Sequence, residues 1–255
     1  DLGGTKISAA RVTDGKVSDV IKTETDPNAP TSAQIAAICD LVRQFGVTPG
    51  EQKIGVAVAG RVSSAGEWFA VNSHILTQID EVPLRQLLEQ ELGQPVTIEN
   101  DALAAALGEY VAGAGKGYNS FAYVTVSTGV GGGLILDGSP IVSSSGLAGH
   151  IGFTTSRMPG SGCGSGRSNT VESIASGRAL AARAADMGHQ TRTGRDVYAA
   201  YLSGADWATQ LVSDSARAIS ELSSNLKAML DIEAVVIGGG VGLLEPGNGL
   251  DQQLL

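Results

Sequence analysis

The chain has 255 residues, of which 42% are hydrophobic and 4% aromatic, and its formal net charge is −9. This length fits one large domain or two small ones, and the hydrophobic content indicates a folded core and not a disordered chain. An acidic balance without a basic run argues against nucleic-acid binding, because neutralising phosphates requires clustered Lys and Arg.

Cysteine usage and hydropathy indicate a cytoplasmic protein. Cys39 and Cys163 lack the spacing of a disulfide framework, and no apolar run has the length of a membrane span or the features of a signal peptide. The sequence begins on a turn at Asp1 and stops within a helical pattern at residues 250–255. We therefore expect further residues at both ends.

The N-terminal half is predicted to alternate strands with helices. The expected strands are residues 7–12, 16–23, 53–59 and 95–98, and helices are expected from Thr31 to about residue 45 and over 82–92 and 102–111. A hairpin turn at Thr13-Asp14-Gly15 joins the first two strands, and Thr31 is a suitable helix N-cap.

The C-terminal half repeats this order of hairpin, helix and strand. It contains a hairpin over 123–136, a loop-rich region over about 139–170, helices over 171–187, 195–202 and 207–230, and a strand over 234–237 that ends in several glycines. Such alternation predicts an α/β fold with a mixed sheet, in which ligands bind beyond the carboxyl ends of the strands.

Two turns rich in glycine and threonine suggest a phosphate site. They are Asp1-Leu2-Gly3-Gly4-Thr5-Lys6 and Ser127-Thr128-Gly129-Val130-Gly131-Gly132-Gly133. Backbone N–H groups and hydroxyls converge in such turns without side chains in the way, and Asp1 is a candidate ligand for a magnesium ion or its water. Alone, the first motif is better explained as an ordinary hairpin, but the two together predict nucleotide chemistry.

Asn100 and Asp101 stand at the end of a predicted strand, just before a helix. A carboxylate at this place suits acceptance of a proton from a hydroxyl that attacks phosphorus. A pKa near the ordinary value of about 4 is expected to suffice, because the proton leaves late. In isolation, helix N-capping is the simpler explanation of the pair.

His150 and Glu172 are candidate contacts to sugar hydroxyls. A structural loop histidine explains His150 equally well, and Glu172 suits the first turn of a helix through its charge. Zinc is not expected, because a zinc site requires four nitrogen or sulfur ligands. Here only Cys163 is available, with His150 as a second ligand that is remote in the sequence.

In this order, the motifs resemble the ROK family of sugar kinases, within the hexokinase–actin–Hsp70 superfamily. The resemblance rests on residues 1–6, 99–101, 125–133, 146–152, 171–177 and 238–242 and extends to about Leu244. It implies two ribonuclease-H-like domains of the actin/hexokinase type, with mixed sheets flanking a central cleft, which we place at residues 1–112 and 113–255. It further implies ATP, Mg²⁺, a small-molecule amino sugar and a homodimer, with no nucleic acid or membrane as a partner.

The resemblance also implies a role for each matching residue. Asp101 corresponds to the catalytic base. The residues expected to bind the sugar are Asn100, His150, Glu172, Gly60 and Asn72. Those expected to bind the nucleotide or its metal are Asp1, Gly3, Gly4, Thr5, Lys6, Ser127, Thr128, Gly129 and Gly131, with Gly239 and Gly240 near the adenosine.

The chain departs from the family at its zinc site. The family uses a His in Glu-x-Gly-His and three Cys in Cys-x-Cys-Gly-x-x-Gly-Cys, and these four positions are Phe153, Cys163, Ser165 and Thr170 here. We therefore expect no zinc, and the loop over 154–169 must be held by packing and hydrogen bonds or be mobile.

His150 bears on the substrate. Most family members have Glu at this position, whereas the N-acetylmannosamine kinases resemble this chain in having His. The resemblance thus implies ATP-dependent phosphorylation of the 6-hydroxyl of N-acetylmannosamine, in amino-sugar and sialic acid catabolism. The alternatives are an N-acetylglucosamine kinase or glucokinase of the family, or a non-catalytic sugar-sensing regulator, for which a lost Asp101 would be one indication. An Hsp70-like ATPase does not fit the length.

Overall fold

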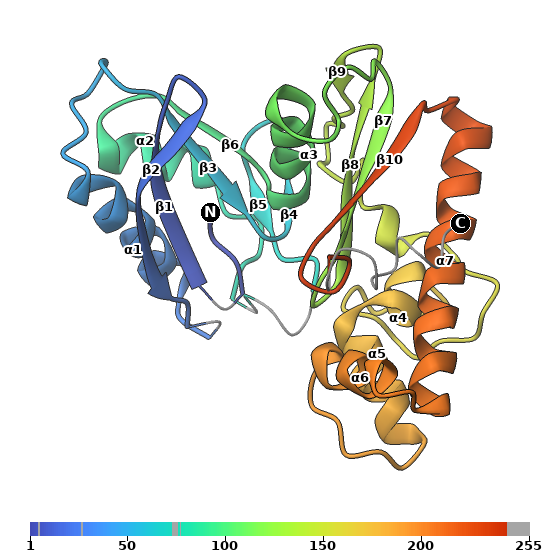
Figure 1. Ribbon diagram of the computed structural model, residues 1–255. Helices are drawn as coiled ribbons and strands as arrows, with labels where there is room; N and C mark the ends of the chain where they lie inside the picture. The colour runs from blue at the N-terminus through green and yellow to red at the C-terminus, as the bar shows by residue number, and fades with distance from the viewer. Residues whose placement is uncertain (5, 27, 73–75, 77, 244–255) are drawn as a thin grey trace. The chain divides into compact units, whose positions relative to one another are not determined.

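A computed structural model describes residues 1–4, 6–26, 28–72, 76 and 78–243 (Figure 1). The chain divides into two compact units, Asp1–Ala104 with Val142–Ala148 (unit 1) and Ala105–Ile141 with Gly149–Leu255 (unit 2). The change of unit falls inside helix α3 (Asp101–Ala112), before the predicted boundary at residues 112 and 113. The later part of α3 belongs to unit 2 because Tyr110 stacks on Phe121 there, with ring centroids 6.2 Å apart.

Strand pairs form the framework of unit 1. β1 (Lys6–Thr13) and β2 (Lys16–Glu24) form an antiparallel hairpin, as do the short β4 (Arg61–Val62) and β5 (Trp68–Phe69). β3 (Ile54–Val58) pairs in parallel with β6 (Val96–Asn100). Leu2 forms single bridges to Ile7 and to Val58, and so links the first hairpin to the parallel pair.

Two helices cover these strands, α1 (Thr31–Gln44) and α2 (Leu84–Leu92). Their buried apolar residues pack in one core with Leu2, Val58 and the fully buried Trp68. The predicted N-cap at Thr31 is wrong, because Pro30 holds that position and the Thr31 hydroxyl donates to the Gln78 carbonyl at 3.1 Å. Helix α2 begins later than predicted because Val82 pairs with Trp68.

Unit 2 contains a mixed sheet in the order β10-β7-β8-β9. β7 (Phe121–Val126) and β8 (Val130–Leu136) form the predicted second hairpin, and β9 (Ser139–Pro140) extends it. β10 (Ala234–Gly238) runs parallel to β7, so the carboxyl ends of these two strands lie side by side. The prediction of a mixed α/β sheet is confirmed here.

The helices of unit 2 follow in chain order: η1 (Ile151–Phe153, 3₁₀), α4 (Val171–Ala175), α5 (Gly177–Asp186), α6 (Gly194–Leu202) and α7 (Asp206–Leu230). The predicted single helix over 171–187 is broken at Ser176, whose backbone is extended, because the Gly177 N–H donates to Ser127 of the hairpin turn at 2.8 Å. The helix expected over 250–255 lies outside the described residues. None of the described helices is both long and apolar enough to cross a membrane.

Candidate active site

Asn100 holds Asp101 in place at the start of α3. The Asn100 side-chain oxygen accepts from the N–H groups of Ala102 and Leu103, at 3.0 Å each, and so caps the helix. Its amide nitrogen donates to the Gly60 carbonyl at 2.8 Å and to Asp101 Oδ1 at 3.0 Å. An amide has two hydrogens and two acceptor sites, and all four are used here. This arrangement fixes the direction of the Asp101 carboxylate, and the contact of Asn100 with the sugar stays a prediction.

Asp101 is a partly buried carboxylate with an altered proton affinity. Burial raises the pKa of Asp101 above its ordinary value, although the hydrogen bonds from the Ala102 N–H and the Asn100 amide oppose the rise. The expectation of an ordinary pKa is therefore wrong, and the group is a stronger base than an exposed carboxylate. Both of those hydrogen bonds go to Oδ1.

Gly60 belongs to the same cluster in unit 1. Its φ is +117°, and a Cβ added there would lie 2.5 Å from the Phe69 carbonyl oxygen, so the position requires glycine. Burial also raises the pKa of the neighbouring Glu99, whose carboxylate accepts the Asn100 N–H at 2.8 Å. Asn72, the other sugar residue predicted in this unit, is half-buried after β5.

The first glycine turn closes as a hairpin. The Gly3 N–H donates to Lys6 at 3.0 Å and the Ser8 N–H donates to Asp1 at 2.8 Å, while Leu2 bridges to Ile7. Asp1 and Lys6 are exposed and Gly4 is half-buried, so polar groups surround an accessible turn. Thr5 lies outside the described residues.

The second glycine turn is short and exposed. Ser127, Thr128 and Gly129 connect β7 to β8, and the Ser127 N–H donates to the Gly129 carbonyl at 2.9 Å. The hydroxyl-bearing Ser127 and Thr128 face solvent. Gly131 and the two glycines after it lie within β8, where a Cβ on Gly132 would collide with Ile151. The glycine run therefore has a packing reason in addition to the predicted contact with phosphate.

Glu172 supports this turn from α4. Its buried carboxylate accepts the Val130 N–H at 3.0 Å through Oε2 and the Gly164 N–H at 3.2 Å through Oε1. A Cβ on Gly129 would lie 2.6 Å from Oε2, so a side chain at this position would have to displace the carboxylate. Both oxygens thus accept from the backbone, and the contact of Glu172 with sugar hydroxyls stays a prediction.

Gly239 and Gly240 lie next to the second turn. Gly239 has a φ of +91°, and a Cβ there would meet the carbonyl of Val126. The Val241 N–H also donates to Val126, at 2.9 Å. The structure therefore brings the predicted adenosine segment to the same sheet edge as Thr128, within unit 2.

His150 precedes η1 and is stacked on Phe153, with ring centroids 5.6 Å apart and planes inclined by 29°. Gly149 approaches β8 closely, since a Cβ there would lie 3.2 Å from the Gly132 carbonyl oxygen. His150 is therefore carried by a segment packed against the hairpin of unit 2.

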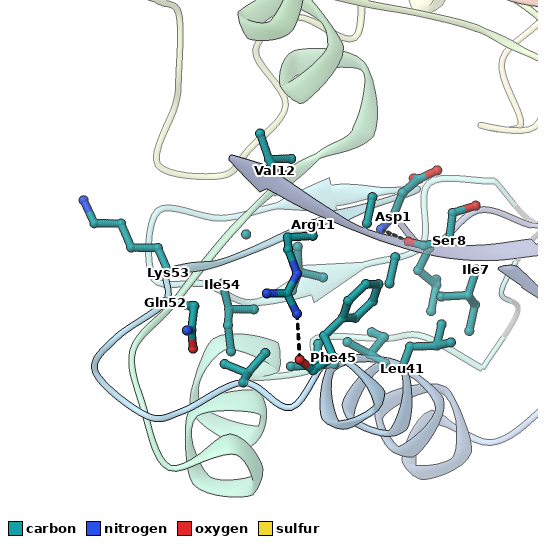
Figure 2. Close-up of a pocket in the computed structure, with 18 of the residues that line it drawn as sticks. Asp1, Ile7, Ser8, Arg11, Val12, Leu41, Phe45, Gln52, Lys53 and Ile54 are labelled. Atoms are coloured by element: carbon teal, nitrogen blue, oxygen red, sulfur yellow. Dashed lines mark hydrogen bonds between the residues drawn. The ribbon is translucent and has the colours of Figure 1, made fainter. Parts of the chain in front are cut away.

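A cavity of about 630 Å³ lies in unit 1 between β1, β3 and α1 (Figure 2). Leu41 of α1 and Phe45, which follows α1, line it, and Arg11 donates to the Phe45 carbonyl at 2.9 Å. The Asp1 backbone nitrogen donates to the Ser8 carbonyl at 2.8 Å. Of the predicted site residues that are described, only Asp1 lines this cavity, so we do not assign it to the sugar or the nucleotide.

Comparison with known proteins decides the family. The model of the ROK family matches residues 1–247. The chain belongs to the ROK family. It is 40% identical to the N-acetylmannosamine kinase of Citrobacter koseri over 248 residues, which cover 96% of this chain and 83% of that protein. The resemblance predicted from the motifs is thereby confirmed.

Solved ROK structures share this fold. The ROK hexokinase from Thermus thermophilus is 32% identical with a TM-score of 0.81, over 99% of this chain and 84% of that one. A ROK family glucokinase from Streptomyces griseus, solved in complex with glucose and AMPPNP, is 31% identical with a TM-score of 0.78, over 94% and 82%.

In this ROK chain, three of the four family zinc positions carry side chains that do not suit zinc. Phe153 stacks on His150, and the Thr170 hydroxyl caps α4 by accepting from Ser173 at 3.1 Å. Cys163 Sγ and Ser165 Oγ lie 2.9 Å apart. Phe153, Ser165 and Thr170 supply no thiolate or imidazole, so the residues present do not fit a structural zinc ion.

Hydrogen bonds hold the loop that zinc would otherwise close. Asn169 has a φ of +54° and links two parts of the loop: its carbonyl accepts from Ser156 at 2.8 Å, and its side chain accepts from Gly160 at 2.9 Å. The Cys163 N–H donates to the Arg167 carbonyl at 2.7 Å. Packing and hydrogen bonds thus order this loop, which is one of the two outcomes expected from the sequence.

A cavity beside the second glycine turn was not predicted. Arg178, Arg192 and Arg195 line a cavity of about 510 Å³ in unit 2 together with Thr128 and Gly240. They come from the starts of α5 and α6, far along the sequence from the turn that they join. In the sequence, the only local sign of this cavity is that Arg192 and Arg195 flank the Thr-Gly pair at the start of α6. This pattern is too short to predict a binding site.

Proposed function

We propose that this chain catalyses the ATP-dependent phosphorylation of the 6-hydroxyl of N-acetylmannosamine. The observation that carries the proposal is the 40% identity to an N-acetylmannosamine kinase over 96% of the chain, in a sequence that keeps Asp101. The 31–32% identity to a hexokinase and a glucokinase makes glucose the principal rival substrate.

Asp101 is the proposed base. As the sugar oxygen forms a bond to the γ-phosphorus, the bond from that phosphorus to the bridging oxygen breaks and its electron pair leaves with ADP. The hydroxyl proton passes to Asp101, late in a loose transition state. A pKa raised by burial brings the carboxylate closer to the proton affinity that this transfer favours. Asn100 fixes the direction of the carboxylate by donating to Oδ1.

The two glycine turns are the proposed holders of the phosphates, and the basic cavity beside Thr128 fits their negative charge. Mg²⁺ prefers one or two carboxylates together with water and phosphate oxygens, and the exposed Asp1 carboxylate fits that preference. When bound, the ion would neutralise charge on the phosphates. The proposal requires both units to act on one sugar and one nucleotide in a central cleft, as the family resemblance implies. We also propose, from the family resemblance, that the protein is a cytoplasmic homodimer.

A coupled assay of ADP release with N-acetylmannosamine, N-acetylglucosamine, glucose and mannose tests the proposal. We expect the highest kcat/KM with N-acetylmannosamine, and an Asp101→Asn preparation gives the background from contaminating kinases. Activity on glucose alone would overturn the substrate assignment. No activity on any of the four sugars would favour a sugar-sensing regulator.

A further inference from the structure

One short segment of the chain belongs to a different unit from its neighbours in the sequence. Residues Val142–Ala148, which we call the strap, pack with unit 1, whereas β9 before them and η1 after them belong to unit 2. The strap ends two residues before His150, the predicted sugar contact. The contacts that hold the strap therefore bear on the main chain that leads to His150.

Backbone contacts lay the strap against β4 and the turn that follows it. The Ser64 N–H donates to the Ser144 carbonyl at 3.1 Å. Gly146 has a φ of +73°, and a Cβ there would lie 1.9 Å from the Val62 carbonyl oxygen. A side chain at Gly146 would therefore collide with the backbone of β4.

Arg61 adds a side-chain contact to the strap. Its guanidinium carbon lies 3.9 Å from the centroid of the Phe69 ring on the paired strand β5, and its Nη1 donates to the Ser145 carbonyl at 2.5 Å. A guanidinium held over an aromatic face donates in a fixed direction. Arg61 directly follows Gly60, whose carbonyl accepts the Asn100 amide. The strap is thus tied down next to the cluster around Asn100.

The strap is closed by a turn of its own. The Ser143 carbonyl accepts the Gly146 N–H at 3.0 Å, and the Ser143 hydroxyl oxygen accepts the Ala148 N–H at 3.1 Å. These two bonds fix the backbone of the strap up to its last residue. A displacement at Ser145 is therefore passed on to Ala148, two residues before His150.

We propose that Arg61 is a positioning residue for the sugar site. Through Ser145 and the closed turn it fixes the end of the strap, and so the main chain that carries His150. The inference rests on the function proposed above, because His150 is a sugar ligand only in that proposal. Arg61 acts here without touching the sugar. Its loss should therefore weaken the binding of the sugar and leave the binding of ATP unchanged.

Calorimetric titration with the sugar, without ATP, tests the inference. The probe is N-acetylmannosamine or, if another of the four sugars in the assay binds the wild type more tightly, that sugar. Arg61→Met keeps an unbranched side chain beside Phe69 but removes the charge and the donor. We expect its dissociation constant for the sugar to rise by on the order of tenfold, because one charge-assisted hydrogen bond is lost. Arg61→Lys keeps a charged donor and should recover part of the affinity.

Steady-state kinetics add a readout that general destabilisation would not give. In Arg61→Met the KM for the sugar should rise, while the KM for ATP should stay within about twofold of the wild type. Thermal unfolding of each variant checks that it is folded.

Arg11→Met is the matched control. Arg11 belongs to the same unit, its guanidinium carbon lies 6.0 Å from the centroid of the Phe45 ring, and it donates to the Phe45 carbonyl at 2.9 Å. It thus makes the same two kinds of contact as Arg61, but to the residue that ends α1 and not to the strap. We expect the Arg11→Met variant to bind the sugar as the wild type does.

A double-variant cycle separates positioning from direct contact with the sugar. Ser143→Ala removes a bond that closes the turn, so it should itself weaken sugar binding. Arg61→Met should then cost less affinity in the Ser143→Ala background than in the wild type. Additive losses would mean that Arg61 binds the sugar directly, which overturns the inference. If Arg61→Met fails to fold, Arg61→Lys takes its place in the cycle.

The titration also distinguishes this inference from the proposed function. A protein that binds a sugar without phosphorylating it would refute the kinase, and the Arg61→Met comparison would still be decisive. Phosphorylation of N-acetylmannosamine together with unchanged sugar affinity in Arg61→Met would refute the inference alone. Absence of binding for all four sugars would overturn both.

Discussion

Asp101 in unit 1 and Glu172 in unit 2 are both carboxylates withdrawn from solvent, and both were predicted to act on the sugar. Asp101 accepts its two hydrogen bonds from neighbouring residues on one oxygen, whereas Glu172 uses both oxygens on the backbone of β8 and the loop over 154–169. The family motifs alone do not distinguish how Asp101 and Glu172 are hydrogen-bonded. The two carboxylates thus differ in how many of their oxygens accept from neighbouring residues, and the predictions below test whether this difference separates their roles.

The comparison is tested most strongly at Asp101. Asp101→Asn keeps the Oδ1 acceptor but not the basicity, so we expect turnover to fall by at least about 100-fold while the sugar still binds. The raised pKa means that the folded state disfavours the charge, so at pH 7 the neutral variant should unfold at the same temperature as the wild type or higher. Rate assays, sugar titration and thermal unfolding measure the three quantities. Near-normal turnover would show that Asp101 is not the base.

Glu172→Gln tests the structural member of the pair. The amide can accept one of the two N–H groups, but its NH₂ then faces the other, which should lower the unfolding free energy by about 1–3 kcal/mol in urea. Glu221→Gln is the control, because its ion pair with the well-exposed Arg157 should contribute about 1 kcal/mol or less. Unchanged stability together with lost sugar binding would return Glu172 to the role of sugar ligand.

Asn100→Ala tests how Asp101 is held. Loss of the cap on α3 should cost about 0.5–2 kcal/mol of stability. Loss of the amide donor removes a bond that favours the charged carboxylate, so the pKa of Asp101 should rise further. The base form is then lost at a higher pH, and the acid limb of the kcat/KM profile should move upward. Asn100→Ser keeps a capping oxygen without the amide donor, so it should shift the pH profile with a smaller loss of stability.

The smallest effects are expected in the loop that carries the positions of the family's zinc ligands. Thr170→Ala removes the cap of α4 and should cost about 1 kcal/mol. Addition of 1,10-phenanthroline should leave the thermal midpoint of the wild type unchanged, because Phe153, Ser165 and Thr170 offer no zinc ligands. A midpoint lowered by the chelator would mean that the loop depends on a metal.

Local patterns in the sequence identified much of the fold. Both hairpins and the β6–α3 junction at Asn100 follow from apolar periodicity and turn chemistry. The break at Ser176 was missed because it depends on a bond between Gly177 and Ser127, residues from separate elements. The positions around Asp101 were identified through family motifs, but the raised pKa and the full use of Asn100 depend on burial and on Gly60. The arginine cavity depends on the contact between Gly177 and Gly194, for which the sequence has no local signal.

The hydrogen-bonded loop over 154–169 also has a consequence for the response of the protein to oxidation and metal shortage. A loop closed by several cysteine thiolates and an ion opens when peroxide oxidises the sulfur or when the metal supply runs short. Here Asn169 and Thr170 perform the closure with amide and hydroxyl groups, which neither oxidant nor metal starvation removes. Cys163 is the one thiol left at those four positions, and it lies beside a hydroxyl. The closure made by Asn169 and Thr170 therefore uses neither thiolate nor metal chemistry.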